Sequence, residues 1–584
     1  MILKALYDYY DRCGDLPSLG LELKELSFLL VLDRKGNFVR IEDRRENNTA
    51  HKFLVPKAVS RSSAPVPNFL WDNPSYVLGI SDANYPYDKS RRSNPDKIAK
   101  EEAKREQERV KNTKNHGTFI DLVNNLFEKY PDRYDIRALH TFYSNPDYLA
   151  KVEADNLWPE LKKNLKKNIS FLIEGDTDIL PAKKDLCPIE EKNNKEDHVG
   201  YCLITGKKSE LVKTTSVIPL GRQATAKLVS FQIKSGYDSY GKEKGYNAPI
   251  SKEAEFKFST ALKKLLSKDS RNKFLIGTRF FVFWASTNSE GGKGAEESIF
   301  NLFGFAQADD PNKNIENARK VLQSINSGVL KTSLDDHFYI LGLAPNNTRI
   351  IVSYWSEQPL KQFASKILLH FEDMKIVSGN NDQTPYMGLR SMLRAVSLGG
   401  KSSEATPNLP DAVVKSIFQG YPYPYTLFAS CIRRIRAEQK ISITRAAILK
   451  AYLNRLKYND IKLKVMLDYE NNNQGYLCGR LFAVLDKIQA EANNIHTIKE
   501  RYMNAASATP AAVFATILNL SSHHSENLDE KKKIFYEKIK QEIIGKISSD
   551  GFPVHLNLQD QGRFFVGYYH QLQEFYTPKE NLKK

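Results

Sequence analysis

The chain has 584 residues, of which 41% are hydrophobic and 11% aromatic, a composition typical of folded rather than disordered proteins. The 86 lysines and arginines outnumber the 69 acidic residues, and the net charge of +17 indicates a polyanionic partner, either nucleic acid or an anionic membrane surface. No apolar stretch is long enough for a membrane span and no secretory signal core is visible, so we expect a cytoplasmic protein. The five cysteines lack C-x-x-C spacing, which argues against a zinc ribbon.

Local patterns over residues 1–180 predict mixed α and β structure. Apolar residues at helical spacing predict a short amphipathic helix over residues 1–12. Two apolar runs flank residues 33–37, whose glycine suits a turn with positive φ, and predict a β-hairpin. Residues 95–115 are almost wholly charged and predict a solvated helix, which residues 119–130 continue with an apolar stripe.

A proline-punctuated polar stretch separates this hairpin from the charged helix. Its amides, cations and aromatic rings are, in chain order, Lys57, Arg61, Asn68, Trp71, Asn73 and Tyr76. Amides can read base edges, cations can bind phosphates and an aromatic ring can wedge between base pairs, so the stretch suits a protein that inspects and opens a short duplex. A packed irregular loop with Trp71 in the core is the alternative interpretation.

Residues 181–384 are expected to be rich in β-structure, beginning at residues 201–205. The run TRFFVFW at residues 278–284 predicts a strand that is covered on both faces. Residues 338–343 and 349–355 flank an A-P-N-N turn and predict a second hairpin.

The segment LVSFQIKSGYDSYGKEKGYNAPIS at residues 228–251 opens like a short strand and then loses any core-forming period. Glycines, lysines and tyrosines are interleaved through its remainder. Tyrosines that stack on bases and lysines that bind phosphates are what a nucleic-acid loop requires. An ordinary surface loop with its tyrosines docked on the core is an equally good interpretation of the residue types alone.

Helical patterns dominate residues 385–584. Residues 420–437 predict a helix whose apolar stripe opposes a basic face of Arg433, Arg436 and Lys440. Such a face is either a solvated helix side or a cradle for a phosphate backbone, and the positive net charge favours the cradle. The next predicted helix continues the basic pattern with Arg445, Lys450 and Arg455. Later helical patterns begin at or near Arg480, Thr509, Asn527 and Gln561. Four such helices are enough for a self-contained bundle.

Signatures of common enzymes are missing from the sequence, among them the Walker A, H-E-x-x-H and G-x-S-x-G motifs. The glycine run at residues 291–294 lacks Walker spacing and predicts a flexible turn. His523 and His524 have no acidic or cysteine partner at ligand spacing, so we interpret them as part of a solvated loop. We therefore expect no catalytic residue, metal or cofactor. A nuclease whose acidic residues converge only in the fold is one alternative, and a general RNA-binding factor is another.

Several segments along the chain, taken in order, form a recognisable series. The N-terminal ALYDYYDRCGDLP and FLLVLDRKGNFVRIEDRRE, the YCLITGK turn, the central SYGKEKGYNAPIS, FYILGLAPNNTRIIVSYW, and the C-terminal GRLFAVLDKIQ and DQGRFFVGYYHQ occur in this order. In this order they resemble the large subunit of the type I-C Cascade, a CRISPR surveillance complex. That family usually carries Asn where this chain has Gln232, and both amides can read a base edge.

The patterns together predict an α+β fold, with mixed and β-containing regions at residues 1–180 and 181–384 and a helical region at residues 385–584. The resemblance implies a non-catalytic subunit that recognises the protospacer-adjacent motif, promotes duplex opening and R-loop formation, and holds the displaced strand. The implied partners are crRNA, double-stranded target DNA and its displaced strand, other Cascade subunits, and a recruited helicase-nuclease. In this family the C-terminal bundle can also be translated separately, which makes Met466 a candidate internal start for residues 466–584; a plain buried methionine is the alternative.

Within this function we assign roles to individual side chains as hypotheses. The residues expected to read the motif are Asn68, Asn73, Gln232 and Asn247. The residues expected to contact phosphates or to stack on bases are Lys57, Arg61, Tyr240, Lys242 and Lys244. We expect Arg433 and Arg436 to hold the displaced strand.

Overall fold

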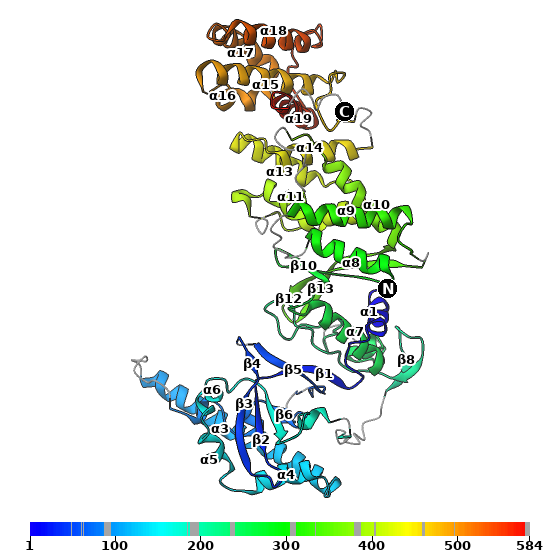
Figure 1. Cartoon of the computed structure of the whole chain (residues 1–584), viewed down its shortest axis with the longest axis vertical. Coiled ribbons are helices and arrows are strands. Elements are labelled where there is room, and N and C mark those ends of the chain that lie inside the picture. The colour runs from blue at the N-terminus through cyan, green and yellow to red at the C-terminus, as the bar shows by residue number, and fades with distance from the viewer. Residues whose placement is uncertain are drawn as a thin grey trace. The chain divides into compact units, whose positions relative to one another are not determined.

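The structure is a computed structural model, and its described residues are 1–47, 49–59, 61, 64–86, 95–183, 185–186, 198–233, 240–303, 311–332, 335–378, 387–401, 405–457, 462–495 and 497–577. Small sheets and helices are mixed over the first part of the chain, and helices alone follow (Figure 1). The predicted α+β fold with a helical C-terminal region is therefore confirmed.

The chain forms two compact units, Asp15–His198 and a larger unit that joins Met1–Gly14 to Val199–Lys584. The first fourteen residues thus pack with the larger unit. The three regions expected from the sequence, with boundaries after residues 180 and 384, stay a prediction.

The described residues of the unit Asp15–His198 form two sheets. The four-stranded sheet has the order β3 (Phe38–Asp43), β2 (Phe28–Leu32), β7 (Ile169–Ile173), β6 (Trp71–Asp72), and the three-stranded sheet the order β1 (Leu21–Leu26), β5 (Thr49–Pro56), β4 (Arg45–Glu46). β2 and β3 are antiparallel and confirm the predicted hairpin, with Gly36 at φ +88° in the turn. Every residue of β2 is buried because alternate side chains enter two different cores, Leu30 on one side and Leu29 on the other.

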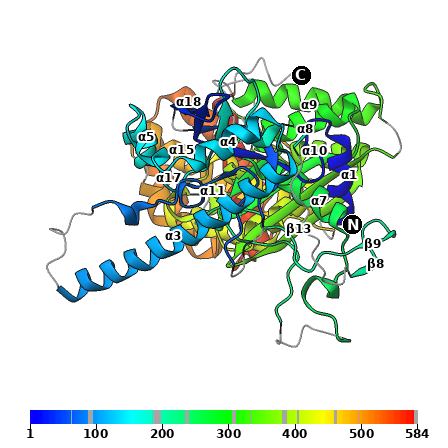
Figure 2. The ribbon, with the colours of Figure 1, turned by 90° about the horizontal axis from the view of Figure 1, so that it is seen from below.

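The helices of this unit are α2 (Pro74–Val77), α3 (Pro95–Lys129), α4 (Tyr134–Ser144), α5 (Tyr148–Glu153) and α6 (Trp158–Lys162). Figure 2 shows α3 as a long, straight helix. Its C-terminal half buries Phe119, Val123 and Leu126 completely, as the apolar stripe predicts. The side chains of its charged N-terminal half are largely exposed, which confirms the solvated helix.

The larger unit is built around an antiparallel sheet with the order β10 (Lys273–Ile276), β11 (Arg279–Ala285), β12 (His337–Asn346), β13 (Arg349–Pro359). Phe281 and Phe283 of β11 belong to one buried cluster, whereas Val282 and Trp284 belong to another. The prediction of a strand covered on both faces is confirmed, as is the β12–β13 hairpin. The cluster with Trp284 is completed by α1 (Ile2–Arg12) and α7 (Lys252–Leu266).

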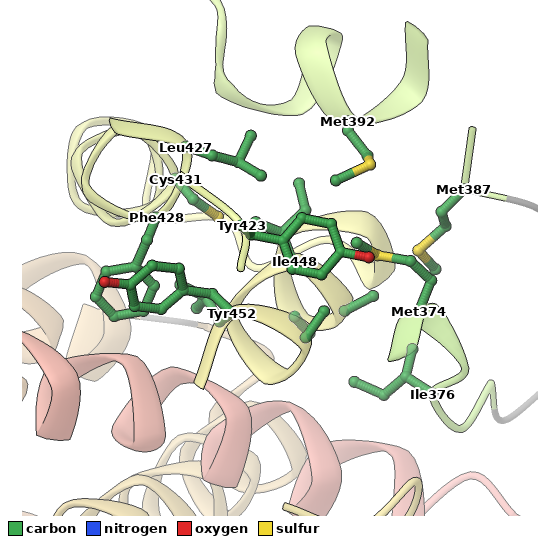
Figure 3. Close-up of a cluster of buried hydrophobic side chains, with 14 of the residues drawn as sticks. Met374, Ile376, Met387, Met392, Tyr423, Leu427, Phe428, Cys431, Ile448 and Tyr452 are labelled. Atoms are coloured by element: carbon green, nitrogen blue, oxygen red, sulfur yellow. The ribbon is translucent and has the colours of Figure 1, made fainter. Parts of the chain in front are cut away.

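The other face of this sheet packs against α8 (Glu290–Phe303) and α10 (Leu360–Met374), and α9 (Pro311–Ser327) packs on these two helices. The helices that follow are α11 (Leu389–Val396), α12 (Leu409–Phe418), α13 (Tyr425–Glu438), α14 (Ile443–Arg455), α15 (Gln474–Asn493), α16 (Thr497–Ala506), α17 (Pro510–Ser525), α18 (Glu530–Ile544) and α19 (Leu558–Glu574). One buried cluster continues from the sheet through these helices. Figure 3 shows its middle, where the rings of Phe428 and Tyr452 stack with centroids 4.2 Å apart.

Two local predictions are wrong. Residues 228–231 form no strand: the pairing there is limited to a single bridge between Lys227 and Arg349, and the Val229 carbonyl accepts from the Thr215 hydroxyl at 2.6 Å instead of from a neighbouring strand. The glycine run at residues 291–294 is no flexible turn, since it lies inside α8. A Cβ on Gly291 would lie 2.6 Å from Thr332 Cγ2, so the glycine permits close packing.

Element boundaries differ in three other places. The strand expected from residue 201 is β8 (Val199–Tyr201), which pairs with β9 (Lys208–Glu210). Helix α18 is capped by Asp529, whose carboxylate accepts from the Lys532 amide, rather than by Asn527. The sequence patterns did not predict α16. The start of α17 after Thr509 is confirmed.

Candidate nucleic-acid interface

Trp71 and Asn68 both point into the protein. Trp71 is 1% exposed, and its Nε1 donates to the Pro56 carbonyl at 3.1 Å. The structure thus supports the alternative in which Trp71 packs in the core. In this conformation its ring cannot insert between base pairs. Asn68 is also buried, and its Oδ1 accepts from the Val59 amide at 3.0 Å, so its amide group orders the loop.

Two other candidates of this stretch, Asn73 and Arg61, have partners within the loop. Asn73 is the N-cap of α2 and accepts from the Ser75 amide at 3.0 Å. The Arg61 Nε donates to the Val66 carbonyl at 2.7 Å, and its guanidinium forms an ion pair with the buried Asp72. Lys57 is half-buried. The sequence correctly picks out a polar loop here, but much of its polarity serves to hold the loop together.

A cavity of about 490 Å³ adjoins this loop, and sequence analysis missed it. Its walls include Arg61 and Tyr76 from the loop side and Lys111 and Lys114 from α3. The Arg61 guanidinium carbon lies 4.1 Å from the centre of the Tyr76 ring. Because charged helix faces are usually just solvated, no local signal distinguishes these two lysines from their neighbours.

The central loop presents a different arrangement from residue 240 onward; residues 234–239, including Tyr237, lie outside the described part of the chain. Tyr240 is 99% exposed and adopts φ +53°. Lys242 is exposed, and its ammonium group has no partner among the described residues. Gln232 is exposed too. These three side chains lie where a partner molecule can contact them.

The base of this loop is fixed by short backbone contacts. Gly245 packs so closely that a Cβ there would lie 2.6 Å from the Val212 carbonyl oxygen. The Asn247 Nδ2 donates to the carbonyls of Lys242 and Lys244, each at 3.1 Å. The Asn247 amide therefore shapes the loop around the lysines, within a 3₁₀ turn at Lys244–Asn247.

The electrostatics around the loop favour anions. Burial lowers the pKa of the Lys227 ammonium, and the positive charge of Lys244 lowers it further. Lys213 is compensated by Glu243 at 2.9 Å, and both groups are exposed. An anion bound here would lower the repulsion between Lys227 and Lys244.

The basic face of α13 is smaller than the sequence predicts. Helix α13 ends at Glu438, and Gln439 follows with φ +50°, so Lys440 does not continue the face. Arg433 is exposed and has no hydrogen-bond or ion-pair partner among the described residues, and the Arg436 Nη2 donates to the Asn504 carbonyl at 3.3 Å. The predicted cradle is thereby reduced to Arg433 and Arg436.

The basic residues of α14 are also unavailable. Arg445, Lys450 and Arg455 are buried or nearly so. Arg445 pairs with Glu438, and Arg455 pairs with Asp373. The expected continuation of the basic face into α14 is wrong, because all three side chains are buried or nearly so and both arginines are paired with carboxylates.

The family model for the CRISPR-associated protein Cas_Csd1 matches residues 6–576. The chain belongs to the Csd1 family. Csd1 is the large subunit of type I-C Cascade, so the resemblance seen in the sequence is confirmed. No curated protein matches the chain.

The histidine pair of this Csd1 protein lies in a helix, contrary to the solvated loop that the sequence predicts. His523 and His524 are part of α17, and His524 contacts the side chains of Gln489 and Asn493 at 3.0 and 2.7 Å. Within the described residues, no group of three or more His, Cys, Asp or Glu side chains is placed to hold a metal ion. No helix in the described part of the Csd1 chain combines the length and apolar character needed to cross a bilayer.

Met466 lies between α14 and α15, ahead of the last helices of the Csd1 chain. The residue is 51% exposed, so the alternative of a plain buried methionine is wrong. Separate translation of residues 466–584 stays a prediction. The described cysteines 13, 202, 431 and 478 form no disulfide with one another, and Cys187 is outside the described residues.

Proposed function

We propose that this Csd1 chain recognises the protospacer-adjacent motif, promotes duplex opening and R-loop formation, holds the displaced strand and helps to recruit the helicase-nuclease. It acts in the cytoplasm, without catalysis of its own, beside crRNA, target DNA and the other Cascade subunits. In guided systems base pairing reads the long target sequence, whereas protein reads the short adjacent motif.

The observation that carries this proposal is the loop at residues 240–247. Tyr240 and Lys242 are exposed, while Asn247 fixes the backbone of the loop. A ring that can stack on a base and a cation that can bind a phosphate are therefore both accessible to a nucleic acid. The family membership narrows the nucleic acid to those of a CRISPR complex.

Among the four amides proposed for motif reading, Gln232 is the exposed one. We assign direct contact with a base edge to Gln232 first. Asn68, Asn73 and Asn247 already accept or donate within their own loops. Their role in recognition is to hold the loop backbone in the shape that meets DNA.

The displaced strand is assigned to the exposed side of α13. The charge of Arg433 is not compensated by any of the described residues. Arg436 donates one hydrogen bond, to the Asn504 carbonyl, and its other N–H groups can meet a phosphate. Phosphates bound there would release counterions, so this part of the affinity falls steeply with salt.

The test uses the assembled guide complex with and without this chain. Binding to target duplexes that carry or lack the adjacent motif should differ strongly with the chain and little without it. Equal binding without the chain would refute the proposal. Incubation of the purified chain with DNA and Mg²⁺ or Mn²⁺ covers the nuclease alternative, since we expect the DNA to remain intact. Binding that needs neither guide complex nor motif would favour a general RNA-binding factor.

A further inference from the structure

The cavity beside α3 has a wall of two uncompensated cations. Lys111 and Lys114 lie one helical turn apart, both are exposed, and neither ammonium group has a partner among the described residues. Arg61 adds a third cation whose charge is partly balanced by Asp72. Three cations around one carboxylate leave a net positive cavity, which favours an anion such as a phosphate.

The loop side of the cavity is a guanidinium plane that rests on an aromatic ring. Tyr76 lies at its floor and is only 5% exposed, and the Arg61 guanidinium covers the Tyr76 ring at 4.1 Å, so the flat face open to a ligand is that of Arg61. Nucleobases stack on aromatic rings and on guanidinium planes, and such stacking tolerates any base. Gln107 on α3 adds an amide that can meet a polar base edge.

The size of the cavity fits the same ligand. At about 490 Å³ it lies within the usual range of small-ligand sites. It is lined in addition by apolar atoms of Ala64 and Val110. A ligand that joins a planar ring to a phosphate satisfies both walls, whereas a simple inorganic anion would leave the flat wall unused.

We propose that this cavity binds one unpaired nucleotide of a DNA strand, with its phosphate at Lys111 and Lys114 and its base stacked on the Arg61 guanidinium, which rests on Tyr76. The site rests on the proposed function, because an unpaired nucleotide arises when the duplex beside the motif opens. Capturing that nucleotide stabilises the opened state relative to the paired one. A free nucleotide has the same chemistry, so the experiment separates the two.

The probe is a DNA duplex with a short unpaired segment that contains 2-aminopurine, titrated with the full chain at several salt concentrations. The first variant is the double change Lys111→Ala/Lys114→Ala, and the second is Val110→Trp, which fills the cavity without removing a charge. The matched control is Lys104→Ala, a cation on the same helix about 10 Å along from Lys111 that does not line the cavity.

We expect the double variant to bind roughly fivefold or more weakly, with a salt slope lower by about 0.7 for each phosphate that a lysine no longer neutralises. Val110→Trp should abolish the change in 2-aminopurine fluorescence, and Lys104→Ala should behave as the parent. Equal binding by the parent and the double variant would overturn the site. A loss of binding free energy for Lys104→Ala half as large as that for the double variant would also overturn it, because the lysines of the cavity would then matter no more than any other lysine of α3. Displacement of the probe by dAMP at a concentration similar to that of the DNA would assign the cavity to a free nucleotide and overturn the strand site.

Failure of this site is distinguishable from failure of the proposed function. If the cavity variants bind normally but Lys242→Ala still weakens motif-dependent binding by the assembled complex, only the cavity assignment falls. If the parent complex itself shows no motif dependence, the proposed function falls first.

Discussion

Arg480 of α15 and Glu542 of α18 form a two-point ion pair, with Nη1–Oε1 and Nη2–Oε2 distances of 3.2 and 2.8 Å. The Arg480 side chain is fully buried, whereas Glu542 is about one-third exposed. Gln571 of α19 accepts from the Arg480 Nε at 3.0 Å. One guanidinium therefore ties three helices of the C-terminal region together.

Removal of the carboxylate should destabilise this region. Glu542→Gln leaves a buried guanidinium without its counter-charge, and we expect a loss of roughly 1–3 kcal/mol, below the value for a fully buried pair because Glu542 is partly solvated. Chemical denaturation monitored by circular dichroism measures it. The double variant Arg480→Met/Glu542→Leu removes both charges and should lie closer to the parent. A single variant as stable as the parent would contradict this account.

The same pair predicts a pH dependence. Burial disfavours the charge on Glu542, but the hydrogen bonds and charge of Arg480, and to a smaller extent those of Lys546, outweigh it, so the pKa of Glu542 lies below its usual 4.5. The pair's stabilisation is thus complete above pH 4.5 and is lost as pH falls through the lower folded pKa. The difference in unfolding free energy between parent and Glu542→Gln should be constant from about pH 8 to about pH 5 and shrink on further acidification. A difference that grows on acidification would contradict a pKa of Glu542 below its usual value.

The close contact between α15 and α19 depends on a glycine, Gly479, at the point where the two helices meet. A Cβ on Gly479 would lie 1.9 Å from the Phe564 carbonyl oxygen, which leaves no room for alanine. Gly479→Ala should therefore force the helices apart and destabilise the protein by at least about 1–3 kcal/mol. Gly117→Ala in α3 is the matched control, because nothing lies within 4 Å of its Cβ and a gain of roughly 0.5–1 kcal/mol is expected there. Thermal unfolding of both variants compares them directly, and equal shifts would refute the steric explanation.

Lys242 should contribute to DNA affinity without regard to sequence. Its exposed ammonium can neutralise one phosphate, so Lys242→Ala should weaken binding to every DNA and lower the salt slope by about one unit. The measurement is a titration at several salt concentrations. Lys213→Ala is the control, since Glu243 already compensates that lysine and a smaller effect is expected. A sequence-dependent loss for Lys242→Ala would argue against a phosphate contact.

Gln232 should contribute to the preference for particular DNA sequences rather than to affinity for every DNA. A base-edge contact discriminates between sequences by roughly 1–3 kcal/mol, so Gln232→Ala should narrow the difference between DNA with and without the motif and leave the salt slope nearly unchanged. Competition between the two DNAs for the assembled complex measures this preference. An unchanged preference would remove Gln232 from the motif site.

Patterns that repeat along one element were predicted well. The strand at Arg279–Ala285 and the stripe through Phe119, Val123 and Leu126 were found because the period of the apolar side chains is a local property. The glycines of α8 were misread because a glycine permits a turn or a close contact equally well. Only Thr332, which is distant from α8 along the chain, identifies the close contact at Gly291.

The amino-acid sequence by itself determined the α+β class, the family and the loops that carry cations and amides, since these depend on composition and local order. The tertiary structure alone decided which of those polar groups are available. Asp72 engages Arg61, Glu438 engages Arg445, and the exposed Lys242, Lys111 and Lys114 meet no such partner among the described residues. The physical reason is that a charged side chain is neutralised by whichever opposite charge the fold brings to it, and that partner can lie anywhere along the chain.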